Sequence, residues 1–329
     1  MKNIRNSNKS SFLKKIFIKI CRKMGYEIID QNNYEIPTLN KPLNENLSQL
    51  GYSSINLPLG EVKITRKVKT LDIIIRSCSS VNMLTQNKSR LFEKEKIEYT
   101  LRTIKSLLNS SSDSQLESLK INFKIIDHNS SDDNLKKIDN IFKNFGKDYV
   151  LIKLDVSKFN DQIKKTNQRG DEVSLNQISN MANIHQSLLE SKQCEDLIYF
   201  VEDDYIHNKD SIKEMIFTYE RVASQIKNEL IICPTDYPYL YTKAEATQNF
   251  LGHKYHWRRI NETLCTFLTS KEIIEKYWDN YTNMCEFEHA PFEKPMHDIY
   301  EKELCISPIP SLALHFTNIN SIFGLSPNI

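Results

Sequence analysis

Glycine is scarce in this chain of 329 residues, which contains only 7. The two closest glycines, Gly51 and Gly60, lie too far apart for the GxGxxG turn of dinucleotide-binding folds or for the GxxxxGK[ST] phosphate loop. If the protein binds a nucleotide, it must therefore hold that nucleotide without a glycine-rich cradle.

Three further absences narrow the class of protein. The 7 cysteines include no CxxC pair and no zinc-ligand spacing, so we expect a reducing compartment, with Cys78, Cys233 and Cys265 as small core residues. No run of about 18 apolar residues is present, which excludes a transmembrane helix. The net charge of +2 provides no basic field for a nucleic acid. We expect a cytoplasmic protein.

The first 66 residues differ in pattern from the rest. Residues 9–26 combine lysines and an arginine with apolar residues at helical spacing and have no small-residue cleavage site, which predicts a basic amphipathic helix rather than a signal peptide. That helix either contacts a membrane surface peripherally or packs on its own domain or a partner. Residues 27–66 are rich in Asn, Pro and Ser and indicate an arm. Residues 67–329 form the second predicted domain.

Apolar runs alternate with helical periodicity through the first part of this second domain. Such alternation predicts an α/β fold with a mostly parallel central sheet and helices on both faces. The predicted strands are 70–76, 121–127, 149–154, 197–201 and 230–233, and the helices are 97–108, 135–145, 175–188 and 212–222. Later segments predict strands at 263–268 and 311–316, a helix at 269–278 with a capping box at its start, and a helix at 298–304.

Polar residues follow several of the predicted strands. They are Arg76, Asp127, the triplet Glu202-Asp203-Asp204, and His315. Because ligands of open α/β sheets bind beyond the carboxyl ends of the strands, we expect these side chains to share one site.

The acidic triplet is the strongest of these signals. Three adjacent carboxylates repel one another, and a divalent cation such as Mn²⁺ or Mg²⁺ relieves that repulsion. The alternative is a solvated acidic turn before the helix that begins near Asp210. Because the triplet directly follows the apolar run LIYFV, we favour the metal site.

From about Leu71 to Phe316 the sequence resembles the GT-A glycosyltransferases, and within them the large family-2 group. The resemblance rests on the segments LDIIIR, KIIDHNSSDDN, NQISNMANIHQSL, YFVEDDY, PMHDIYEKE and LALHF, in this order. The triplet departs from the family's DxD pattern, and the glycines of the family's acceptor loop are mostly missing.

The resemblance implies a role for each of these segments. Glu202, Asp204 and His315 would hold the metal, although Asp203 could replace Glu202 and otherwise contacts the substrate. Arg76, Asp127 and Asn129 would meet the nucleotide, and Asn183 or Asn180 the donor sugar. Asp298 would be the catalytic base of an inverting reaction.

Two more groups are candidates for substrate contact. The stretch HKYHWRR contains Trp257, Arg258 and Arg259, and mixed aromatic and cationic side chains suit a sugar face or a phosphate. A solvated basic loop explains the same stretch. Arg169 could meet the diphosphate, although a surface ion pair is the ordinary role of such a residue.

The predicted function is a hexosyltransferase-like enzyme of glycan or surface polysaccharide synthesis. It would transfer a sugar from a nucleotide-sugar donor, expected to be a UDP-sugar, to a glycan or lipid-linked acceptor. The alternatives are a metal-dependent phosphohydrolase or nuclease, and a transferase-like binding module without activity. The sequence predicts neither the sugar nor the oligomeric state.

Overall fold

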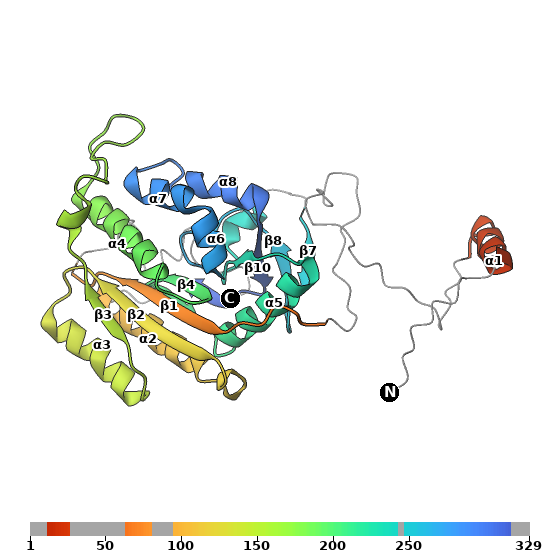
Figure 1. The fold of residues 1–329 in the computed structure, drawn as a ribbon, viewed down its shortest axis with the longest axis horizontal. Helices are drawn as coiled ribbons and strands as arrows, with labels where there is room; N and C mark the ends of the chain where they lie inside the picture. The colour runs from red at the N-terminus through yellow and green to blue at the C-terminus, as the bar shows by residue number, and fades with distance from the viewer. Residues whose placement is uncertain (1–11, 27–62, 81–94, 243–246, 317–329) are drawn as a thin grey trace. The chain divides into compact units, whose positions relative to one another are not determined.

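The computed structural model describes residues 12–26, 63–80, 95–242 and 247–316 (Figure 1). The chain divides into two compact units, and the smaller contributes one described helix, α1 (Phe12–Lys23). This helix has basic residues and no acidic ones, and it exposes apolar side chains that include Phe12 and Phe17. None of the described helices has the length and apolar character needed to cross a bilayer. The helix lies within residues 9–26, where the sequence predicts a basic amphipathic helix.

The larger unit is built on a nine-stranded sheet with the order β3-β2-β1-β4-β9-β6-β10-β8-β7. Its strands are β1 (Thr70–Ser77), β2 (Lys120–Asp127), β3 (Val150–Lys153), β4 (Leu197–Glu202), β6 (Leu230–Ile232), β7 (Asn249–Leu251), β8 (His256–Arg259), β9 (Phe267–Ser270) and β10 (Leu304–Ile309). A separate two-stranded sheet pairs β5 (Tyr205–His207) with β11 (Ala313–His315).

The direction of the strands determines at which edge of the sheet their carboxyl ends lie. Strands β3, β2, β1 and β4 are parallel, and β6 and β10 are parallel to each other. Strand β9 runs antiparallel between β4 and β6, so the turn before β9 lies at the carboxyl ends of both neighbours. The predicted α/β class, with a mostly parallel sheet, is confirmed.

Helices cover both faces of the sheet (Figure 1). On one face α2 (Lys96–Ser111) contacts α3 (Asp132–Asn144) and α5 (Ser211–Ile226). On the other, α7 (Trp278–Glu286) contacts α4 (Leu175–Ser191), α6 (Lys271–Lys276) and α8 (Lys294–Lys302). Strand β1 lies between these layers and is buried along its whole length, as its apolar sequence predicts.

The first half of the chain follows the predicted order of elements, and the second half corrects it in four places. Residues 263–266 form a turn, and the strand begins only at Phe267. Ser270 rather than Thr269 caps α6, accepting a hydrogen bond from the Ile273 N–H at 3.3 Å. The final strand belongs to the small sheet rather than the main one. Strands β8 and β10 were not predicted, and the helix predicted at 298–304 is α8, which begins and ends earlier, at Lys294–Lys302.

Candidate metal and substrate site

Two distant segments bring the acidic triplet and His315 together. After Glu202 the chain turns sharply into β5, and β11 pairs with β5 so that His315 lies opposite Tyr205. The backbone N–H of Phe316 then donates to the carbonyl of Asp204 at 2.8 Å. The small sheet therefore places the histidine beside the carboxyl end of β4, although 110 residues separate it from Tyr205 in the chain.

Glu202, Asp204 and His315, which we call the metal-ligand cluster, each offer one ligand atom within 4.8 Å of the others. His315 Nε2 lies 3.2 Å from Asp204 Oδ2. The other oxygen of that carboxylate, Oδ1, is buried, and the described residues give it no hydrogen-bond partner. A buried carboxylate oxygen without a donor is costly unless a cation occupies the space beside it. The residues therefore fit a divalent metal ion.

The electrostatics of the cluster agree with this fit. Burial is the main cause of a raised pKa at Glu202, and the charge of Asp204 adds to it, while Arg76 opposes the shift. Burial would raise the pKa of Asp204 as well, but His315, Lys96 and Arg76 outweigh it and lower that pKa. Two carboxylates are thus held close together in a poorly hydrated position, where a cation would remove their repulsion.

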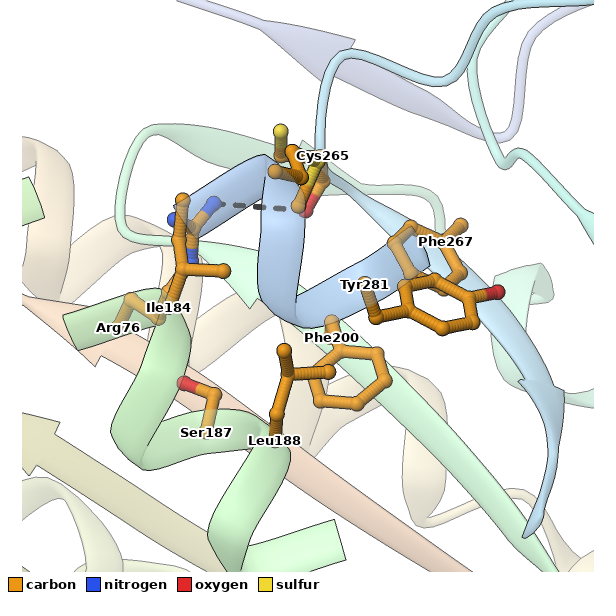
Figure 2. Close-up of a pocket in the computed structure, with 9 residues that line it drawn as sticks. Arg76, Ile184, Ser187, Leu188, Phe200, Cys265, Phe267 and Tyr281 are labelled. Carbon is orange, nitrogen blue, oxygen red and sulfur yellow. Dashed lines mark hydrogen bonds between the residues drawn. The ribbon is translucent and has the colours of Figure 1, made fainter. Parts of the chain in front are cut away.

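Arg76, at the end of β1, holds the carboxylate of Glu202. One guanidinium nitrogen donates to Glu202 Oε1 at 2.7 Å and to the Cys265 carbonyl at 3.4 Å, and the other donates to Asn180 at 3.4 Å. Figure 2 shows the bond to Cys265 at one end of a small cavity lined mainly by apolar side chains of β4, β9, α4 and α7. That cavity of about 20 Å³ is too small for a sugar. Arg76 itself is buried, and its guanidinium is directed at Glu202.

Asp203 points away from the cluster. Its carboxylate accepts hydrogen bonds from Thr100 Oγ1 at 2.9 Å and the Cys78 N–H at 3.2 Å, and it forms an ion pair with Lys96 at 3.2 Å. The side chain therefore ties β4 to α2 and to the end of β1. The sequence does not choose between Glu202 and Asp203 as a metal ligand. The structure places Glu202 with Asp204 and His315.

The predicted nucleotide contacts Asp127 and Asn129 lie at the carboxyl end of β2, and the predicted donor contact Asn183 lies on α4. Asp127 is buried and accepts hydrogen bonds from Ser77 Oγ at 3.0 Å and from Ser130 N and Oγ at 3.0 and 2.6 Å. Asn129 is exposed, with a positive φ of 61°. Asn183 is buried and donates to the Ile126 carbonyl at 3.2 Å.

These positions distinguish the two candidate asparagines on α4. Asn183 is directed at the backbone of β2, and its Oδ1 is buried without a partner among the described residues. Asn180 instead accepts from Arg76, which in turn binds Glu202. Of the two, Asn180 is the one linked to the metal-ligand cluster.

The basic stretch and Arg169 occupy three different environments. Trp257 is fully buried in β8, where its indole N–H lies 3.4 Å from a Glu214 oxygen, so it has no surface to offer a ligand. Arg258 forms an ion pair with the buried Asp236 at 2.6 Å and lies over the Tyr241 ring. Arg169 is exposed in the turn closed by the Thr166–Glu172 bridge.

Asp298 lies on the exposed side of α8. Within the part of the chain that the structure describes, no hydrogen bond or ion pair joins it to the metal-ligand cluster. A second acidic residue of this region, Glu293, directly precedes α8. Its carboxylate accepts a hydrogen bond from the turn before β9, which lies at the carboxyl end of β4. The sequence analysis missed Glu293, because nothing in its local pattern separates it from a surface glutamate.

No known family model matches the sequence, and no curated protein matches it. Solved structures overlap it weakly. TarS of S. aureus, residues 1–349 in complex with UDP, is 9% identical with a TM-score of 0.39, and the match covers 72% of this chain and 57% of that one. The galactosyltransferase LgtC is 12% identical with a TM-score of 0.38, covering 75% and 87%.

A third structure is a cytidylyltransferase from Leptospira borgpetersenii, 11% identical with a TM-score of 0.37, covering 79% of this chain and 82% of that one. The chain spans 33% of the longer S. aureus TarS chain. Similarity this low decides neither activity nor substrate, so the case for a function rests on the residues of this chain.

Proposed function

We propose that this protein is a metal-dependent glycosyltransferase that uses a nucleotide-sugar donor. The observation that carries the proposal is the metal-ligand cluster at the carboxyl end of β4, with its buried and unpartnered Asp204 oxygen. The mixed carboxylate and imidazole set favours Mn²⁺ over Mg²⁺, because Mg²⁺ takes oxygen ligands almost exclusively.

Each residue of the site has a place in the reaction that we propose. Glu202, Asp204 and His315 would hold the cation, and Arg76 fixes the orientation of Glu202. A divalent cation bound there would offset the negative charge that develops on a departing nucleoside diphosphate. Lys96, which is paired with Asp203, keeps a positive charge at the same edge of the sheet.

The acceptor side of the proposed reaction centres on Asp298. The resemblance to the GT-A family supports Asp298 as the base that deprotonates an acceptor hydroxyl, with inversion at the sugar carbon. A UDP-sugar as donor and a glycan or lipid-linked acceptor belong to the same proposal. The exposed position of Asp298 makes Asp298→Asn the most informative single variant for this part of the mechanism.

The test is binding of UDP, GDP and CDP by isothermal titration with and without Mn²⁺, followed by hydrolysis of the matching nucleotide sugars. We expect metal-dependent binding of one nucleotide and slow release of free sugar, both lost in Asp204→Asn. Metal binding without any nucleotide binding would overturn the proposal.

A two-metal phosphohydrolase is the rival that this experiment also addresses. Among the described residues a single group of three or more ligands is present, whereas two-metal chemistry needs a second cation about 3.5–4 Å from the first. Cleavage of a nucleic acid or a phosphate monoester, with no release of sugar from any donor, would support that rival.

A further inference from the structure

The turn Thr263–Thr266, which precedes β9, has an unusual backbone. Leu264 and Cys265 have positive φ angles of 50° and 59°, although neither is a glycine. The left-handed region is disfavoured for residues with a side chain, and two such residues in succession are rarer still. Residues in this conformation persist only where surrounding contacts hold them, and they concentrate at functional sites.

One buried carboxylate accepts three hydrogen bonds from this turn. Glu293 is only 2% exposed. One of its oxygens accepts from the Thr263 N–H at 2.9 Å, and the other accepts from Thr263 Oγ1 at 2.8 Å and from the Cys265 N–H. All three donors belong to the turn. Because both carboxylate oxygens already accept hydrogen bonds from the turn, the arrangement suits Glu293 to fix the backbone of the turn rather than to accept a proton from a substrate.

The other side of the turn contacts the residues around the metal-ligand cluster. The Cys265 carbonyl accepts from Arg76 at 3.4 Å, and the same guanidinium nitrogen binds Glu202 at 2.7 Å. Thr266 Oγ1 accepts from the backbone N–H of Glu202 at 3.3 Å. The turn therefore touches Glu202 twice, through its backbone and through the arginine that orients its carboxylate.

We propose that Glu293 is a positioning residue for the metal site, acting through the Thr263–Thr266 turn on Arg76 and Glu202. The inference rests on the proposed function only in taking Glu202 as a metal ligand. Loosening the turn would free the Cys265 carbonyl and the Thr266 hydroxyl, and Glu202 would lose the contacts that direct it toward Asp204 and His315. Partners of this kind behind a metal ligand typically change metal affinity by about 10–100-fold.

The opposite end of α8 supplies a matched control. Glu303 is 3% exposed and also accepts three hydrogen bonds, from Tyr277 and Lys276 at 2.6 Å and from Asn228 at 3.1 Å. None of these donors touches the metal-ligand cluster. Glu303→Gln therefore reproduces the loss of a buried, hydrogen-bonded carboxylate without disturbing the turn.

The experiment measures Mn²⁺ affinity of the full chain by electron paramagnetic resonance of the free ion, in wild type, Glu293→Gln and Glu303→Gln. Iodoacetamide labelling of Cys265, located by mass spectrometry, reports directly on the turn. We expect about tenfold weaker Mn²⁺ binding and faster Cys265 labelling in Glu293→Gln alone. Thr263→Val removes one of the three donors and provides a milder second variant, with a smaller loss of affinity expected.

Three results would overturn the inference, and they can be told apart. If wild type binds Mn²⁺ and both glutamine variants bind it equally well, Glu293 has no positioning role, although the metal site stands. If wild type binds no Mn²⁺, the proposed function fails and the inference fails with it. If Glu293→Gln does not fold, Thr263→Val decides, and unchanged affinity with faster Cys265 labelling would refute the link between the turn and the metal.

Discussion

The ring of Tyr205 is stacked on that of His315, with the centroids 4.5 Å apart and the planes 12° from parallel. The Tyr205 hydroxyl lies 2.6 Å from that of Tyr237, which donates to the Thr263 carbonyl at 3.2 Å. Tyr205 therefore links the His315 imidazole to the core of the domain and supports its orientation, although Tyr205 is not itself a proposed metal ligand.

This stacking predicts different effects for two substitutions at one position. Tyr205→Leu removes the aromatic face and should weaken Mn²⁺ binding by about tenfold, as expected for a residue that orients a ligand. Tyr205→Phe keeps the ring and should bind Mn²⁺ within about threefold of wild type, on the same scale. Titration of Mn²⁺ at matched protein concentrations measures both. Equal losses in the two variants would show that the hydroxyl, not the stacked ring, supports His315.

Glu202 and Asp203 are neighbours in the chain, but we expect substitutions at the two positions to differ in their effect on Mn²⁺ affinity. Glu202→Gln removes a ligand and should weaken Mn²⁺ binding at least about tenfold. It also leaves the buried Arg76 without its ion pair, so we expect the fold to lose stability as well. Asp203→Asn leaves Lys96 without its ion pair and should lower the free energy of unfolding by about 2 kcal/mol, with little change in Mn²⁺ affinity. Urea unfolding and Mn²⁺ titration separate the two effects. The assignment of ligands is reversed if Asp203→Asn loses the metal.

The sequence leaves this pair ambiguous for a geometric reason. The chain turns at Asp203 and Asp204, so strand alternation does not tell which of Glu202 and Asp203 faces the site. Which side is open depends on α2, whose Lys96 and Thr100 bind Asp203. Those contacts span more than 100 residues and leave no local pattern.

Strands β1 and β4 were predictable because buried parallel strands are nearly continuous apolar runs. Strand β10 was not, because Ser307 and Pro308 interrupt its pattern and a proline cannot donate to a strand ladder. Its position between β6 and β8 is set by tertiary pairing. Trp257 was misplaced for a related reason: in β8 it points into the core, while the neighbouring Arg258 does not.

The buried His207 should make the stability of the fold depend on pH. Burial lowers the pKa of His207 to about 3. Its Nε2 lies 2.6 Å from the Tyr199 hydroxyl, and its Nδ1 is 3.5 Å from Ser106 Oγ. The neutral ring suits this position, and an unfolded chain would protonate it near pH 6.5. The unfolded state therefore binds the extra proton, and stability falls as the pH drops from about 6.5 towards 3.

The expected contribution of His207 is a loss of about 2 kcal/mol in the free energy of unfolding between pH 7 and pH 5. In His207→Gln this part of the pH dependence should disappear, even if the variant is less stable at pH 7. Urea unfolding at several pH values provides the measurement, and the exposed His256→Gln serves as control. An unchanged pH slope in His207→Gln would contradict the assignment.

Asp204 links the metal site to stability in a way that thermal unfolding can detect. Because the cluster exists only in the folded chain, Mn²⁺ at 100 times its Kd should stabilise the fold by about 2.7 kcal/mol. For a domain of this size, that corresponds to a rise in Tm of roughly 5–10 °C.

In Asp204→Asn the rise should vanish, because one ligand charge is lost. Without metal the same variant should melt somewhat below wild type, because it loses the interactions with His315, Lys96 and Arg76 that lower the pKa of the Asp204 carboxyl. The backbone bond from Phe316 N–H to the carbonyl of residue 204 does not depend on the side chain, so β11 keeps its place. A rise in Tm with Mn²⁺ that persists in Asp204→Asn would show that the Asp204 carboxylate is not a metal ligand.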